Sequence, residues 1–70
     1  MAESVYKVIE LIGTSSTSWE EAATTAVQTA SESVRDLRVA EVIQQDLDFG
    51  EGDVTFRTKL RVSFKYETAD

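Results

Sequence analysis

The clearest pattern in the chain is a strict alternation of apolar and polar residues over Val54–Tyr66. Alternation with a period of two is typical of a β-strand with one buried and one polar face. The predicted buried face consists of Val54, Phe56, Thr58, Leu60, Val62, Phe64 and Tyr66. This strand is about twice the usual length of five or six residues. One short helix cannot cover so long an apolar face, so the surplus is expected to meet another subunit or water.

Two further segments predict strands. Ser4–Ile12 reads SVYKVIELI and is rich in β-branched residues, and Arg38–Phe49 reads RVAEVIQQDLDF. The glycine and hydroxyl residues of Gly13–Thr17 predict a turn, because they are typical turn residues and lack the second glycine and the lysine of a phosphate-binding loop. A weak anion site at the helix start is the alternative, and Glu20 and Glu21 there would oppose it. GEGD at Gly50–Asp53 predicts a hairpin turn into the last strand.

A helix is predicted between the first two strands. Ser18 is a candidate N-cap, and Glu21 three residues later completes a capping-box pattern. Arg35 and Arg38 are expected at the far end, where the helix dipole favours cations. Its apolar stripe is formed by Trp19, Ala22, Ala23, Ala26, Val27, Ala30, Val34 and Leu37. The small alanines predict a close approach to the sheet. Packing is the preferred role of Trp19, with ligand stacking as the alternative.

The predicted order is therefore β-α-β-β, an α+β fold in a single domain over residues 1–70. A chain this short buries only about 60% of its unfolded surface. It has no cysteine, so disulfides are excluded. Since histidine is also absent, the only metal ions it could bind are hard cations that prefer oxygen ligands. Oligomerisation is the expected supplement to so small a core.

The charge of the chain restricts its partners. A net charge of −6 argues against binding to nucleic acid or to an anionic membrane surface. No stretch resembles a signal peptide or a membrane span, so a soluble cytoplasmic protein is expected. Without histidine or cysteine the commonest general bases and nucleophiles are missing, which indicates a protein that is not an enzyme.

The polar face of the last strand carries four of the seven bases, namely Arg57, Lys59, Arg61 and Lys65. Acids on the neighbouring Arg38–Phe49 segment are candidate partners, and such cross-strand pairs set register more than stability. The acidic stretch DLDFGEGD is not an EF-hand loop, because the twelfth residue from Asp46 is Arg57 rather than glutamate.

These segments together resemble a known family. VYKVIELIGTSSTSWEEAA, followed by VAEVI and a long last strand ending RVSFKY, looks like the dodecin family over nearly the whole chain. The resemblance implies a sheet wrapped around one helix. It also implies that twelve copies assemble into a hollow homododecamer, which would supply the partner that the long strand requires.

Many dodecins bind flavins between tryptophans, and the resemblance places the flavin-stacking position at Val39 and the flavin hydrogen-bonding position at Arg57. Valine offers no aromatic face, whereas stacking contributes about 1–3 kcal/mol per ring. Arginine only donates hydrogen bonds, where the family's glutamine both donates and accepts. These two departures argue against tight binding of riboflavin or FMN.

The segments SVYKVI, IGTS, TSWE and VSFK are more similar to a calcium-binding branch of the family, which implies a shell that takes up calcium. The resemblance does not supply the ligands. On chemistry alone the candidates are Glu41, Asp46 and Asp48. Twelve chains of −6 would carry about −72, which favours cation accumulation. A flavin-storage protein with a remodelled pocket and a structural shell without a small ligand remain the alternatives.

Overall fold

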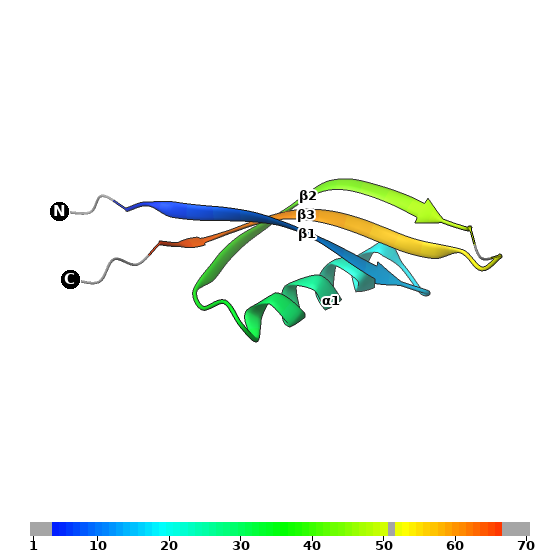
Figure 1. Cartoon of the computed structure of the whole chain (residues 1–70), viewed down its shortest axis with the longest axis horizontal. Helices are drawn as coiled ribbons and strands as arrows, with labels where there is room; N and C mark the ends of the chain where they lie inside the picture. Colours follow the sequence, from blue (N-terminus) through cyan, green and yellow to red (C-terminus); the bar gives the residue numbers. More distant parts are fainter. Residues whose placement is uncertain (1–3, 51, 67–70) are drawn as a thin grey trace.

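The computed structural model of the protein describes residues 4–50 and 52–66. Its elements are β1 (Tyr6–Ser15), α1 (Trp19–Ser31), β2 (Leu37–Asp48) and β3 (Thr55–Lys65). The predicted β-α-β-β order is confirmed. In Figure 1 the helix lies along one face of the sheet, and the sheet runs on past the helix at both ends.

The three strands form one antiparallel sheet in the order β1-β3-β2. The last strand is therefore central, and β1 and β2 are both edge strands. Leu60 at the middle of β3 lies opposite Leu11 of β1 and Val42 of β2. The register places one apolar row from each strand on the face that carries the helix.

The core lies where β3 meets the helix. Thr58, Leu60 and Val62 are fully buried on β3, as the alternation predicted. The buried helix residues are Ala22, Ala26 and Ala30, which confirms the predicted small-residue stripe. The apolar face of β3 is covered only at its centre: Leu60 is 1% exposed, whereas Val54 and Tyr66 near its two ends are 48% and 49% exposed. The predicted surplus of uncovered apolar strand is confirmed.

The prediction of a turn at Gly13–Thr17 is wrong in its first half. β1 continues to Ser15, and Gly13 pairs with Thr58 inside the sheet. The reason is packing: a Cβ at Gly13 would lie 2.0 Å from the backbone oxygen of Ala22 and 2.9 Å from the Cβ of Ala26. Gly13 therefore lets the helix backbone approach the strand, which is a use of glycine within a strand rather than in a turn.

The predicted far end of the helix is also wrong. The helix ends at Ser31, its last turn contains no base, and Arg35 and Arg38 lie beyond it. Val34 lies in the following loop, and Leu37 begins β2 while packing against the same core. The chain turns at Asp36, whose φ of 62° is left-handed and is tolerated by aspartate. The 3.6-residue spacing thus continued past the helix because the loop returns to the core.

The start of the helix agrees with the prediction in one of two hydrogen bonds. Ser18 Oγ accepts from the backbone N–H of Glu21 at 3.0 Å, as an N-cap should. The Glu21 carboxylate instead accepts from Ser15 Oγ at 2.6 Å. This hydrogen bond, followed by one from Thr17, lowers the pKa of Glu21. The end of β1 and the first helical turn are joined by this contact.

The hairpin between β2 and β3 contains Gly52 at a φ of 96°, which favours glycine. Gly50 N–H donates to Asp48 Oδ1 at 3.0 Å, and Gly50 has no positive φ. Residue 51 of the predicted turn lies outside the described residues. In the described part of the chain, no helix is long and apolar enough to cross a membrane.

Candidate functional site

The face of the sheet opposite the helix carries a network of acids and bases across all three strands. Arg61 on β3 lies 3.1 Å from a carboxylate oxygen of Glu10 and 3.9 Å from one of Glu41. Lys59 lies 3.7 Å from the other oxygen of Glu10. All four side chains are between 39% and 62% exposed, so these pairs contribute little to stability and mainly fix register.

The strongest pair of this network joins Arg57 and Asp46. Nε and one terminal nitrogen of Arg57 donate to the two carboxylate oxygens at 2.8 and 3.1 Å, a bidentate arrangement. Gln44 Nε2 approaches the second oxygen at 3.4 Å. The hydrogen bonds from Arg57 lower the pKa of Asp46, and the same contact raises the pKa of Arg57. Asp46 is therefore held ionised beside its partner.

Trp19 connects the helix start to the same part of β2. Its indole Nε1 donates to the backbone oxygen of Asp46 at 3.1 Å, and its ring meets Phe56 edge-on at a centroid distance of 5.1 Å. Its backbone oxygen accepts from the buried Thr58 hydroxyl at 2.9 Å. The preferred packing role of Trp19 is confirmed, because the indole nitrogen and the ring both have partners within the chain.

The three candidate cation ligands all lie on β2 but are not gathered in one chain. Glu41 lies opposite Arg61 and Asp46 opposite Arg57, while Asp48 accepts from the Gly50 backbone. Within residues 4–50 and 52–66 no group of three acidic side chains is close enough to hold a metal. Their role as ligands therefore stays a prediction. Asp46 and Asp48 are two residues apart on an edge strand and therefore lie on the same face of the sheet. A neighbouring copy can approach both from that edge.

The two positions matching the flavin site lie far apart along one chain. Val39 lies near the start of β2, opposite Ser63, and is 61% exposed. Arg57 lies near the other end of β3, and its guanidinium is engaged by Asp46. A pocket containing both would need more than one chain, and their assignment stays a prediction.

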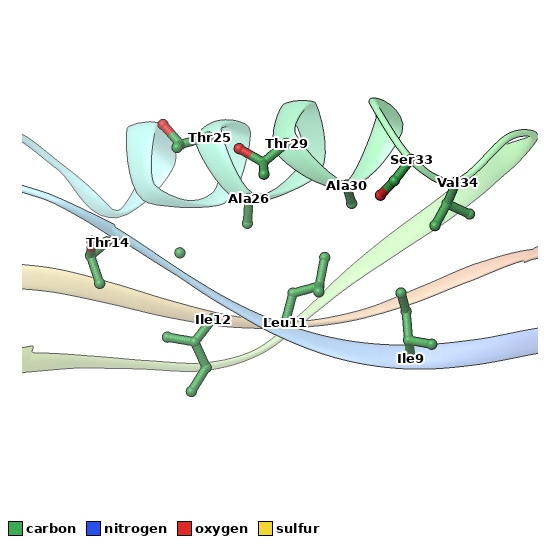
Figure 2. Close-up of a pocket in the computed structure, with 11 residues that line it drawn as sticks. Ile9, Leu11, Ile12, Thr14, Thr25, Ala26, Thr29, Ala30, Ser33 and Val34 are labelled. Carbon is green, nitrogen blue, oxygen red and sulfur yellow. The ribbon is translucent and has the colours of Figure 1, made fainter.

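Sequence reasoning missed a groove between α1 and the edge strand β1 (Figure 2). Its volume is about 420 Å³. In Figure 2, Leu11, Ala26 and Ala30 lie between the helix and the strand, and Thr25 and Thr29 lie on the helix. None of its lining residues is ionisable, so it contains no acid–base chemistry. Gly13, Ala26 and Ala30 line this groove.

The fold and this site define a class: a small β-α-β-β protein with one helix on a three-stranded antiparallel sheet, incompletely covered by its own chain. The sequence model of the dodecin family matches residues 5–67, and the chain belongs to that family.

Several relatives agree with this assignment. The chain is 60% identical to the calcium dodecin of Mycobacterium tuberculosis over 67 residues, which are 94% of each chain. A crystal structure of calcium dodecin from that organism, described as a calcium-chelating immunodominant antigen with a novel calcium-binding site, matches with a TM-score of 0.84 and 57% identity, covering 96% of this chain and 97% of the other. Dodecin from Streptomyces coelicolor matches with a TM-score of 0.89 and 31% identity, covering 99% and 100%.

Proposed function

We propose that this protein is a non-enzymatic, homododecameric shell that binds calcium. The observation that carries the proposal is the 60% identity, over 94% of both chains, to a protein named calcium dodecin. A calcium-chelating neighbour with nearly the same backbone supports it. The described residues add no catalytic constellation, because the acids on the polar face are paired with arginine and lysine rather than placed beside a nucleophile.

The assembly is supported by what one copy leaves uncovered. The helix covers only the centre of the sheet, and Val54 and Tyr66 remain about half exposed. Both edge strands also present unpaired backbone groups, which natural proteins normally cover. Twelve copies of 7.8 kDa correspond to about 94 kDa. Light scattering on a sizing column is expected to give that mass, and a monomer or dimer mass would contradict the shell.

The donor atoms on β2 fit a hard cation. Calcium takes six to eight oxygen ligands, and carboxylates are its usual charged donors. Asp48 forms no ion pair with any base in the described part of the chain, so its charge is not neutralised internally. Asp46 keeps further lone pairs beyond those used by Arg57. One chain cannot complete the ligand set, so we assign the remaining oxygens to a neighbouring copy or to water.

Calorimetric titration of chelator-treated dodecamer tests the proposal. Calcium is expected to bind, and Asp48→Asn and Asp46→Asn are each expected to weaken binding at least about tenfold. Glu41 lies on the same strand at roughly 17 Å from Asp46, so Glu41→Gln tests a separate ion. Glu20→Gln is the matched control, because it removes one carboxylate from the exposed first turn of the helix. Equal weakening by Glu20→Gln would refute the β2 assignment. Absence of calcium binding by the unmodified shell would refute the function itself.

Thermal unfolding provides a second measurement. A ligand of the native state at about one hundred times its Kd stabilises that state by about 2.7 kcal/mol. The unfolding temperature should therefore rise with calcium and return on chelation. Riboflavin and FMN titrations separate the alternative, because a flavin-storage shell quenches flavin fluorescence. Val39 has no aromatic ring to stack on a flavin, and the guanidinium of Arg57 is paired with Asp46. Both observations argue against flavin as the ligand.

A further inference from the structure

We propose that Arg57 competes with calcium for the carboxylate of Asp46 and thereby sets the calcium affinity of the shell. This inference rests on the proposed function, because it concerns one of the two neighbouring β2 acids assigned there to calcium. Within residues 4–50 and 52–66, Asp46 forms an ion pair with Arg57, whereas Asp48 forms none. A cation that binds at this edge of the sheet therefore meets one acid that is free of a base and one that is not.

Both carboxylate oxygens of Asp46 already accept hydrogen bonds from a cationic side chain. Arg57 Nε donates to Oδ1 at 2.8 Å and its terminal nitrogen donates to Oδ2 at 3.1 Å. Gln44 Nε2 approaches Oδ2 at 3.4 Å. A carboxylate that ligates calcium through both oxygens presents the same side that it presents to a guanidinium fork. Arg57 and calcium therefore exclude each other in this mode, and while the pair persists only the outward lone pairs of Asp46 remain.

The main chain of Asp46 is fixed, so the acid does not swing away from its partner as a unit. Its backbone oxygen accepts from Trp19 Nε1 at 3.1 Å, and it lies opposite Arg57 in the register of β2 and β3. Trp19 is held in turn by an edge-on contact with Phe56. The Arg57 side chain, in contrast, is 39% exposed, so its guanidinium can leave for water without burying a charge. Displacement of Arg57 is the change that frees both oxygens.

Charge adds to this competition. Even in water, two unit charges about 4 Å apart interact strongly enough to change a binding constant about fivefold. The double charge of calcium makes its repulsion by the guanidinium larger, and salt makes it smaller. Removal of Arg57 is therefore expected to tighten calcium binding at least about tenfold, which is opposite in sign to the effect of removing an acid of the site. Arg57 keeps the calcium affinity below what the acids alone would give, which favours release of the ion.

Calorimetric titration of calcium into the chelator-treated shell, at about 0.1 M salt where charges are screened over about 10 Å, tests the inference. Arg57→Gln is expected to bind at least about tenfold more tightly than the unmodified shell. Arg57→Lys keeps the charge without the fork and should fall between the two, and it carries the same test if Arg57→Gln does not assemble. In Asp46→Asn shells, adding Arg57→Gln should give no gain, because the contested carboxylate is absent.

Arg38→Gln is the matched control. It removes the same guanidinium charge from the strand that carries Asp46, roughly 26 Å along β2 from that acid. At that distance and salt concentration it should change calcium affinity less than about twofold. It also changes the net charge of the shell by the same amount as Arg57→Gln, so the comparison separates a local competition from general electrostatic attraction.

Melting curves give a readout that a purely structural role of Arg57 would not move. In chelator, Arg57→Gln should melt at or slightly below the unmodified shell, because an exposed pair contributes little. At one fixed calcium concentration it should gain more in melting temperature than the unmodified shell, since a tighter ligand stabilises the native state more. A structural role alone would lower both curves equally.

Unchanged or weaker calcium binding by Arg57→Gln would overturn this inference and leave calcium binding by the unmodified shell intact. Equal tightening by Arg38→Gln would overturn it, as would a gain that persists in Asp46→Asn. The proposed function fails separately, when the unmodified shell binds no calcium. Binding by Arg57→Gln alone would then still support the competition, whereas no binding by either would overturn both.

Discussion

The substitution Gly13→Ala tests how the helix is held against the sheet. The added Cβ would lie 2.0 Å from the backbone oxygen of Ala22, whereas ordinary contacts begin at 3.4 Å. The helix must therefore retreat by about 1.4 Å, and a backbone oxygen cannot rotate away as a side chain could. Overpacking of this kind costs about 1–3 kcal/mol, and we expect the upper part of that range.

Gly50→Ala is the matched control. The nearest atom to its added Cβ is Asp48 Oδ1 at 3.5 Å, an ordinary contact, and Gly50 has no positive φ. There alanine is expected to be neutral or to stabilise by up to about 1 kcal/mol, because it lowers the entropy of the unfolded chain. The two glycine-to-alanine variants are therefore expected to differ by about 3 kcal/mol in unfolding free energy.

Thermal unfolding at one fixed protein concentration measures this difference, since oligomer stability depends on concentration. For a chain of this size, 1 kcal/mol corresponds to about 4–8 °C, so the two variants should separate by more than about 10 °C. Adding Ala26→Gly to Gly13→Ala should restore little, because the nearest obstruction is the Ala22 oxygen. Equal unfolding temperatures for the two glycine variants would refute the close-approach argument.

Three further perturbations test individual contacts. Ser18→Ala removes the helix N-cap and is expected to cost about 1 kcal/mol in a denaturant titration. Thr58→Val keeps the shape of a fully buried side chain but removes its 2.9 Å hydrogen bond to the Trp19 oxygen, at a cost of about 1 kcal/mol in the same assay. The hydrogen bonds from Arg57 lower the pKa of Asp46 below its ordinary value of 3.8. The stabilisation of the folded state by the Arg57–Asp46 pair is therefore fully present above that pH and is lost as the pH falls through the lowered pKa. The stability difference between the unmodified protein and Asp46→Asn, measured by melting from pH 7 to pH 2, should shrink accordingly.

Each of these three predictions has a control variant or a result that would contradict it. Thr24→Ala changes another hydroxyl of the helix, one that bonds the Glu20 oxygen, and it should cost less than Ser18→Ala. Thr55→Val lies at the less buried start of β3 and should be milder than Thr58→Val. A pH-independent difference for Asp46→Asn would show that its pairing with Arg57 is not what the titration reports.

The most predictable part of the fold was β3, and topology explains why. β3 is the central strand, with paired neighbours on both sides and the helix above Thr58, Leu60 and Val62. Every second side chain of β3 is therefore buried, which is the period of two seen in the sequence. Of the three acids expected to pair with the bases of β3, Asp46 and Glu41 do so. Asp48 forms no ion pair in the described part of the chain. Strand order itself was not deducible from the pattern.

The features that sequence reasoning missed depend on contacts distant in the chain. Gly13 and the hydroxyl residues after it have the composition of a turn, yet Gly13 lies in β1. Glycine is needed there because the Ala22 backbone oxygen of the helix occupies the place of a side chain. Leu37 continues the 3.6-residue spacing of the helix, but the helix ends at Ser31 and the left-handed φ of Asp36 turns the chain into β2. No local sequence pattern encodes contacts of this kind.

The edge position of β2 links the proposed assembly to the proposed calcium site. Asp46 and Asp48 lie on a strand whose outer backbone has no partner within residues 4–50 and 52–66, so a copy covering this edge would also be placed to supply further oxygen ligands. Calcium bound at the proposed site would stabilise the contact between copies, and by linkage the contact would raise calcium affinity by the same factor. Dilution that dissociates the shell should consequently release calcium, and chelation should promote dissociation. A shell whose mass is unchanged by chelation at every concentration would place the cation away from this edge.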